Sequence, residues 1–188
     1  MTIEDREIVD RILESEGGKF TDRGDDRGGP TKWGVTLAPF AKAKGIALND
    51  STRAALVTEL KLMTREEAVA IAFEQYLVEP KFTLLGSSQL REVVTDFGYL
   101  ASPRRATIAL QHELGLVEDG VLGPATAAAA NTRDGRRLGF CVIAWWFEYI
   151  GRIVSGNMAD ADHDGKPDNA ENAAGWLNRI GRHQRRLA

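Results

Sequence analysis

The sequence lacks three features that would each point to a different class of protein. It has one cysteine, Cys141, which cannot form an intrachain disulfide, so the fold has to rest on a hydrophobic core. Its net charge of −3 gives no basic surface of the kind that nucleic-acid binding requires. Its apolar run from Leu138 to Ile150 is shorter than the ~20 residues of a bilayer span and is interrupted by Glu148. We therefore expect no nucleic-acid partner and no stable membrane insertion.

Sustained alternation of apolar and polar residues, the pattern of a half-buried strand, is also missing, so we expect no large sheet. With 43% hydrophobic residues the chain can bury one sizeable core, and no shift in composition separates two independent domains. We expect a mainly α, single globular fold with Cys141 in its core. The three histidines, His112, His163 and His183, have neither metal-ligand spacing nor a serine partner, and we expect them at the surface.

Helix signals run through most of the chain. A Thr64-x-x-Glu67 capping box begins one helix, and Gly45 and Gly115 are placed to end two others. The expected helices cover residues 36–44, 51–63, 64–80, 89–100, 134–155 and 173–183, with one more ending at Gly115 and one beginning at Pro124. The glycine-rich turn between Phe20 and Thr36 predicts a small β-hairpin. We interpret the arginines near the C-terminus as a solvated helix face: Arg179, Arg182, Arg185 and Arg186.

The segment from Glu16 to Thr36 concentrates the residues that can carry chemistry. The helix before it has an apolar face made of Ile8, Val9, Ile12 and Leu13. Glu16 falls on that same face at the end of the helix, and Gly17 and Gly18 stop the helix because glycine accepts a left-handed C-cap without steric cost. Apolar neighbours and the helix C-terminal carbonyls both disfavour the ionised carboxylate, as a general acid requires.

A tight turn follows this helix end. Asp25 and Asp26 precede a Gly28-Gly29-Pro30 turn, which would bring Thr31 and Trp33 back beside Glu16. On spacing alone, a solvated glutamate followed by a simple glycine loop remains an equal alternative.

The pattern Glu-Gly-Gly-aromatic, Asp-x-Gly-Gly-x-Thr and aromatic-Gly-Val-Thr between Glu16 and Thr36 resembles the glycoside hydrolase family 108 N-acetylmuramidases, which include bacteriophage endolysins. The resemblance implies a lysozyme-like fold and cleavage of the β-1,4 bond between N-acetylmuramic acid and N-acetylglucosamine in bacterial peptidoglycan. It also implies that Glu16 is the catalytic acid and that Asp26 and Thr31 line the cleft as further catalytic residues. We place Trp33 among the substrate-binding residues. Whether Asp25 or Asp26 is the second carboxylate, and whether the route inverts or retains, stays open.

The segment from Pro103 to Thr126 resembles the peptidoglycan-binding half that accompanies this family. By that resemblance, Asp96 and Tyr99 would face the glycan groove and bind substrate, although simple helix packing is an equal alternative for Tyr99. We expect a muramidase catalytic region over residues 1–95 and a peptidoglycan-binding-like helical region over residues 96–188, packed as one globule.

Residues 160–171 match the twelve-residue EF-hand calcium loop, Asp-x-Asp-x-Asp-Gly-x5-Glu, at every position. Gly165 permits the sharp turn, and Pro167 stands where paired EF-hands usually place an aliphatic residue, so we expect a lone structural Ca²⁺ site. An acidic solvated loop is the alternative. The expected ligands are Asp160, Asp162, Asp164, Lys166 through its backbone carbonyl, Asp168 and Glu171.

The cellular setting follows from the first six residues, which are charged and have no apolar signal core. They predict a protein held in the host bacterial cytoplasm. The resemblance to phage endolysins implies that it then reaches the cell wall through a partner holin. Two other functions remain open: a lytic transglycosylase, and a calcium-responsive wall-binding or secretion-accessory protein without catalysis.

Overall fold

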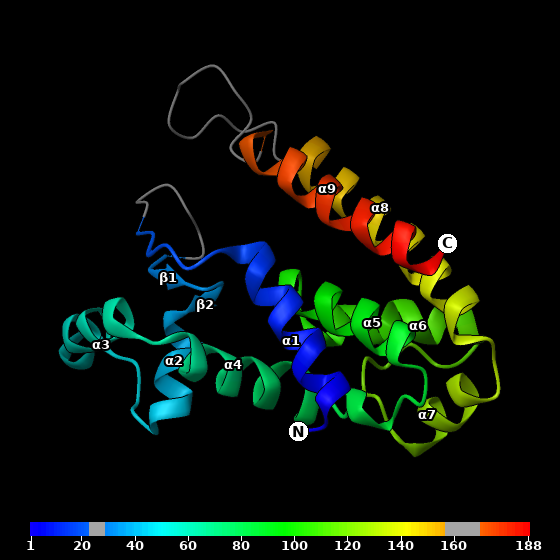
Figure 1. Ribbon diagram of the computed structural model, residues 1–188, viewed down its shortest axis with the longest axis horizontal. Coiled ribbons are helices and arrows are strands. Elements are labelled where there is room, and N and C mark those ends of the chain that lie inside the picture. The colour runs from blue at the N-terminus through cyan, green and yellow to red at the C-terminus, as the bar shows by residue number, and fades with distance from the viewer. Residues whose placement is uncertain (23–28, 157–169) are drawn as a thin grey trace. The chain divides into compact units, whose positions relative to one another are not determined.

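The computed structural model describes residues 1–22, 29–156 and 170–188. By its internal contacts the chain divides into two compact units, an N-terminal unit, Met1–Glu79, and a C-terminal unit, Pro80–Ala188. The described elements are helices apart from one two-stranded sheet (Figure 1), which confirms the expected mainly α fold class. The expected division after residue 95, and the packing of both parts as one globule, stay predictions.

The N-terminal unit is built around the first helix. Its elements are α1 (Ile3–Glu16), β1 (Thr31–Lys32), β2 (Val35–Thr36), α2 (Leu37–Lys44), α3 (Asp50–Leu62), α4 (Arg65–Phe73) and a π-helical turn (Glu74–Val78). Helix α1 packs on α4 through its predicted apolar face, of which Ile8, Val9 and Leu13 have no exposed surface. Burying three such side chains contributes roughly 1.5–3 kcal/mol each, so this face fixes where α1 lies and ends within the unit.

Local signals set the ends of several helices as the sequence predicted. The Thr64 hydroxyl accepts a hydrogen bond from the Glu67 backbone N–H at 3.2 Å, and the Glu67 carboxylate accepts one from the Thr64 N–H at 2.8 Å, which completes the capping box. Gly45 takes the left-handed conformation after α2, and Gly115 does so after helix α6 (Pro103–Leu114). One feature was not predicted. The helix that begins after Thr64 changes to π-helical hydrogen bonding after Phe73.

The C-terminal unit is a bundle around helix α5. Its elements are a 3₁₀ turn (Phe82–Leu84), α5 (Ser88–Leu100), α6, α7 (Pro124–Asn131), α8 (Gly135–Gly156) and α9 (Ala170–Leu187). Helix α5 packs against α6 and α8, and α9 lies along α8 (Figure 1). Trp146 of α8 is fully buried and stacks on Phe97 of α5 with ring centroids 5.4 Å apart. The helix expected over residues 134–155 is therefore confirmed, but it is buried on one face only, since Phe140 and Phe147 are exposed. None of the helices described is long and apolar enough to cross a membrane.

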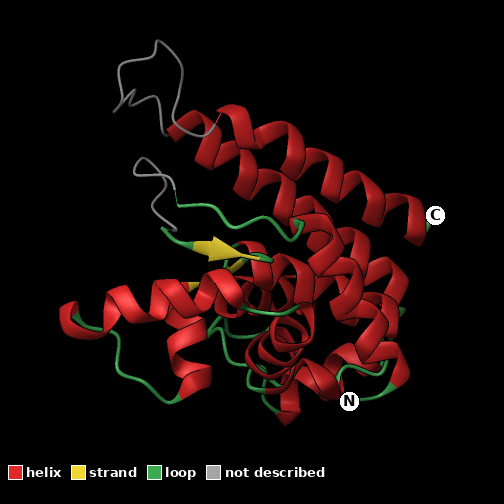
Figure 2. Ribbon diagram, turned by 60° about the vertical axis from the view of Figure 1, so that its left-hand side comes forward, coloured by secondary structure: helices red, strands yellow, loops and turns green. Residues whose placement is uncertain are grey.

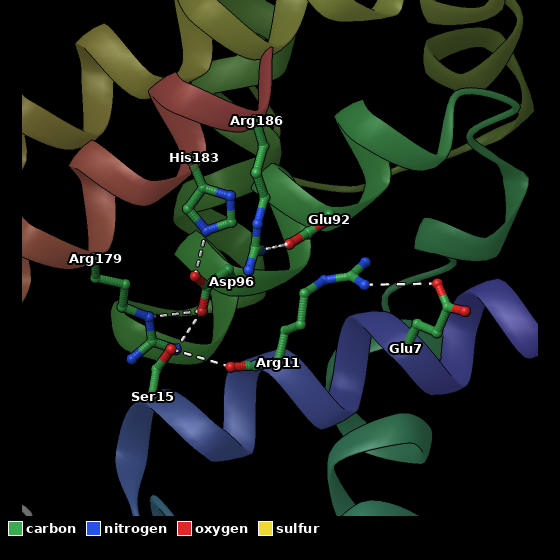
Figure 3. A network of polar contacts seen from close by, with 8 residues as sticks. All are labelled: Glu7, Arg11, Ser15, Glu92, Asp96, Arg179, His183 and Arg186. Carbon is green, nitrogen blue, oxygen red and sulfur yellow. Dashed lines mark hydrogen bonds and ion pairs between the residues drawn. The ribbon is translucent and has the colours of Figure 1, made fainter. Parts of the chain in front are cut away.

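A buried ion cluster joins α5 to α9 in this unit (Figure 3). Asp96 is 3% exposed, and its carboxylate accepts hydrogen bonds from Arg179 and His183, which are 5% and 4% exposed. The Arg179 Nε atom lies 2.7 Å from Asp96 Oδ1. The sequence predictions of a solvated Arg179 and a surface His183 were therefore wrong. The reason is that the partner carboxylate lies 83 and 87 positions away, beyond the reach of any local pattern.

The cluster alters the acid strength of its carboxylate. Burial on its own would raise the pKa of Asp96, but the Arg179 guanidinium and the His183 ring outweigh burial and hold that pKa far below its ordinary range. Asp96 is therefore ionised at neutral pH, and the buried Arg179 guanidinium has the anion that its burial requires. Cys141 also departs from expectation, since it is only half-buried on α8 rather than a core residue.

Replacing the buried Asp96 carboxylate should destabilise the folded protein. We expect Asp96→Asn to lower the free energy of unfolding by about 3–5 kcal/mol, because Arg179 would remain buried without its anion. Urea denaturation measures the change. The control is Glu148→Gln, which removes the ion pair between Glu148 and Arg152 on α8, whose side chains are 63% and 71% exposed, and should cost under about 1 kcal/mol.

The same cluster predicts a pH dependence. Because the folded-state pKa of Asp96 is depressed, its stabilising effect is complete above the ordinary carboxyl pKa of about 4 and is lost as the pH falls below that value. The stability difference between the wild-type protein and Asp96→Asn should therefore shrink as the pH falls through this range. A difference that stays constant from pH 7 to pH 3 would contradict the assigned pKa direction.

Candidate active site

The candidate catalytic carboxylate stands at the end of a buried helix. Glu16 is the last residue of α1 and is exposed to solvent, while Ile12 and Leu13 one turn earlier are buried. The expectation that apolar neighbours enclose its carboxyl was therefore wrong, because the buried face of α1 ends one turn before Glu16. The Gly17 N–H donates to the Leu13 carbonyl at 3.0 Å and closes the helix. Gly17 has φ of 72° and ψ of 159°, so the predicted need for glycine is confirmed, although the backbone leaves the helix extended rather than left-handed. Glu16 is thus held by a rigid helix yet open to a large substrate.

The tryptophan of the hairpin lies directly on the chain that follows Glu16. A Cβ atom built on Gly18 would lie 2.5 Å from the Trp33 ring, so only a residue without a side chain allows the indole to approach this closely. Trp33 itself has a φ of 54°, an uncommon conformation for a bulky residue and a sign of local strain that the surrounding contacts must maintain. The sequence prediction that Trp33 folds back beside the helix end is confirmed.

Three short stretches of extended chain hold that tryptophan in place (Figure 2). Strands β1 and β2 pair antiparallel, with Thr31 opposite Thr36 and Lys32 opposite Val35, as the predicted hairpin requires. Thr21 adds a bridge to Thr31, with N–H to carbonyl hydrogen bonds of 2.9 and 2.8 Å in the two directions. The chain that leaves Glu16 is therefore hydrogen-bonded to β1, on the side opposite β2.

Thr31 is half-buried, and its hydroxyl donates to the Gly29 carbonyl at 2.9 Å. The hydroxyl oxygen keeps its lone pairs for a further donor, such as a sugar hydroxyl or a water. Asp25 and Asp26 lie outside the described residues, so the second carboxylate stays a prediction.

Tyr76 is a residue near the candidate acid that no motif in the sequence identifies. The structure places Tyr76 on the π-helical turn, where burial first and then the charge of Glu16 raise the pKa of its phenol. A shift caused by Glu16 means that the two side chains lie within electrostatic range of each other. π-Helical turns are rare and occur frequently at functional sites. The sequence carries no visible signal for this turn, because its residues also fit the ordinary helical period.

The other two predicted substrate residues belong to the C-terminal unit. Tyr99 is half-buried near the end of α5, and the Asp96 carboxylate is engaged by Arg179 and His183 as described above. Their predicted roles at a glycan stay predictions, and Asp96 has a structural role of its own.

The predicted calcium loop lies outside the described residues, except that Ala170 and Glu171 begin the backbone of α9. Helices α8 and α9, which flank this loop in sequence, pack against each other. In the part of the chain that the structure describes, no group of three or more His, Cys, Asp or Glu side chains is placed to hold a metal ion.

The close approach of Trp33 to Gly18 predicts a sensitive position. Gly18→Ala should displace the indole and destabilise the protein by about 1–3 kcal/mol, as overpacking does, with a loss of near-ultraviolet circular dichroism from Trp33. Gly151→Ala is the control, because a Cβ there meets nothing within 4 Å and should be neutral or slightly stabilising within α8. If both variants have the same melting temperature and unchanged circular dichroism spectra, the indole is not packed on Gly18.

Comparison with known proteins adds independent information. Residues 9–101, from α1 to the residue after α5, match the family described as glycosyl hydrolase 108. The solved structure of Brucella abortus SagA is similar over 97% of this chain and 92% of that chain, with a TM-score of 0.72 and 23% sequence identity, which confirms the lysozyme-like helical fold. No curated protein sequence gives a significant match. The part of the chain that carries Glu16, Gly18 and Trp33 thus matches glycosyl hydrolase 108, and this match indicates glycoside hydrolase activity.

Proposed function

We propose that the protein is a peptidoglycan hydrolase of the N-acetylmuramidase type, which cleaves the β-1,4 bond between N-acetylmuramic acid and N-acetylglucosamine. The observation that carries the proposal is the placement of Glu16, an exposed carboxyl at the end of a buried helix and followed by a glycine covered by Trp33. This arrangement lies within the span matched to glycosyl hydrolase 108, a family of enzymes that break glycosidic bonds.

In the proposed mechanism Glu16 donates its proton to the glycosidic oxygen as the bond to the anomeric carbon breaks. The resulting oxocarbenium-like transition state needs a nearby negative charge and a positioned water, and we assign these tasks to Asp26 and Thr31. Trp33 offers an indole face on which the apolar face of a sugar ring can stack. The Tyr76 phenol, within range of Glu16, is suited to orient the carboxyl by hydrogen bonding.

Two further elements belong to the proposal. The first is a Ca²⁺ ion held by residues 160–171, whose five acidic side chains would otherwise repel one another in a short loop. Because α8 and α9 flank that loop and pack together, an ion bound there would stabilise their pairing. The second is delivery from the host cytoplasm to the wall through a holin, as for the phage endolysins that the Glu16 motif resembles.

The catalytic assignment predicts that Glu16→Gln loses wall lysis by about a hundredfold or more and keeps its melting temperature, because the amide preserves shape but cannot donate the proton. Clearing of a turbid cell-wall suspension measures lysis. Glu14→Gln, another exposed glutamate on α1, should retain full activity. Asp26→Ala should lose less activity than Glu16→Gln.

Substantial lysis by folded Glu16→Gln protein would exclude Glu16 as the acid. Mass spectrometry of the products separates the enzymatic alternatives, since a muramidase leaves reducing muramic ends and a lytic transglycosylase leaves anhydro ends. A protein that binds walls without clearing them would support the non-catalytic wall-binding alternative.

Calcium should act as a ligand of the folded state. At free calcium about a hundredfold above its dissociation constant, binding adds about 2.7 kcal/mol of stability, so a chelator should lower the melting temperature by roughly 5–10 °C and lower lysis with it. Added calcium should restore both. Asp160→Ala and Glu171→Ala should abolish the response, whereas Glu148→Gln, an exposed acid on α8, should keep it. An unchanged melting curve in chelator, with no calcium binding in calorimetry, would show that the loop binds no calcium and is only an acidic turn.

A further inference from the structure

A small pocket opens on the C-terminal unit among helices α5, α6 and α8. Its volume is about 120 Å³, and its lining is Phe97, Arg105, Ile108, Trp145, Tyr149 and Arg152. This volume is somewhat below the roughly 150 Å³ of an enclosed cavity that holds benzene, but the pocket is open to solvent, so one ring or a short branched chain can enter it in part. A disaccharide needs several times that space, so the pocket does not fit a glycan strand.

Ring contacts hold the aromatic walls of the pocket in place. Phe97 stacks on the fully buried Trp146 and meets Tyr149 with centroids 5.7 Å apart and planes at 59°. Trp145 packs against His112 with centroids 5.0 Å apart. Because these side chains already contact one another, a ligand would not have to order them on binding, and such preorganisation favours affinity.

Two cations stand at this pocket with little to neutralise them. The Arg105 guanidinium lies over the Tyr149 ring, 5.0 Å from its centroid, and no ion pair joins it to a carboxylate among the described residues. Arg152 pairs with Glu148 at 3.2 Å, but the two side chains are 71% and 63% exposed. An ion pair so exposed contributes little, so a ligand anion can replace Glu148 at small cost.

We propose that this pocket binds a small carboxylate that bears one aromatic ring, with the ring among Phe97, Ile108 and Trp145 and the carboxylate between Arg105 and Arg152. A planar guanidinium suits a carboxylate because it can donate two parallel hydrogen bonds to it. The carboxylate could belong to a free aromatic acid or to the C-terminal residue of a peptide. The pocket is lined by residues of the C-terminal unit alone, none of which is assigned to catalysis, so the proposal does not depend on the proposed hydrolase activity.

The probe is 3-phenylpropionate, and its neutral match is 3-phenylpropanamide. Saturation-transfer NMR and calorimetry at low salt should show the acid binding with a dissociation constant on the order of 1 mM, as expected for a ligand of this size, and the amide binding about fivefold or more weakly. N-acetyl-L-phenylalanine mimics a peptide C-terminus. Tighter binding of this compound than of 3-phenylpropionate indicates a peptide source, and weaker binding a free acid.

Variants test whether binding occurs in this pocket. Ile108→Trp should fill the pocket and abolish binding. Arg105→Gln should weaken binding of 3-phenylpropionate about fivefold and leave the affinity for 3-phenylpropanamide unchanged. Arg133→Gln, an exposed arginine elsewhere in the unit, should bind as the wild type does. Melting curves show that each variant is folded, and Arg105→Gln remains informative if Ile108→Trp does not fold. Absence of binding at millimolar acid, equal binding of the amide, or an unchanged affinity in folded Arg105→Gln protein would overturn the proposal.

Discussion

The C-terminal unit depends on one buried carboxylate. Asp96 sits in the core face of α5, where an isolated ionised group would be destabilising by several kcal/mol, and it is tolerated because Arg179 and His183 reach it from α9. The dependence is mutual, since the two α9 side chains are nearly as buried as their partner (Figure 3). Hydrophobic contacts alone would allow α9 to slide or rotate, whereas a three-membered ion cluster accepts one register. The cluster thereby specifies where the last helix packs.

A different constraint organises the N-terminal unit, namely the two glycines after Glu16, of which Gly17 is required for its backbone conformation and Gly18 for the space beside it. Glu16 is useful as an acid only if its helix ends there and leaves its carboxyl open. Gly17 supplies the positive φ at which the helix ends, and Gly18 supplies the surface on which the Trp33 indole lies. The hairpin and the Thr21 bridge then hold Trp33 against that surface. An aromatic ring and a carboxyl group are thus brought close in one segment, which is an arrangement suited to holding and protonating a sugar.

The two units therefore offer different kinds of recognition. The N-terminal unit presents an exposed carboxyl group and an aromatic ring, as the hydrolysis of a polymer requires, because a long chain has to pass across the site. The pocket among α5, α6 and α8 is small, apolar and flanked by arginines, as the capture of one compact anion requires. The same α5 helix contributes Phe97 to this pocket and Asp96 to the ion cluster, and Trp146, which stacks on Phe97, also contacts His183 of the cluster with ring centroids 5.5 Å apart.

Much of this protein was predictable because its signals are local. The capping box at Thr64, the glycine caps at Gly45 and Gly115, the apolar face of α1 and the hairpin before Thr36 all act over a few residues, so the sequence alone determined them. The candidate acid Glu16 also followed from spacing and from the motif around it. Only the tertiary structure decided the burial of Arg179 and His183, the π-helical turn that places Tyr76 near Glu16, and the pocket that joins three helices. Each of these depends on partners far apart in the chain or on a change of helical register, and neither leaves a periodic pattern in the sequence.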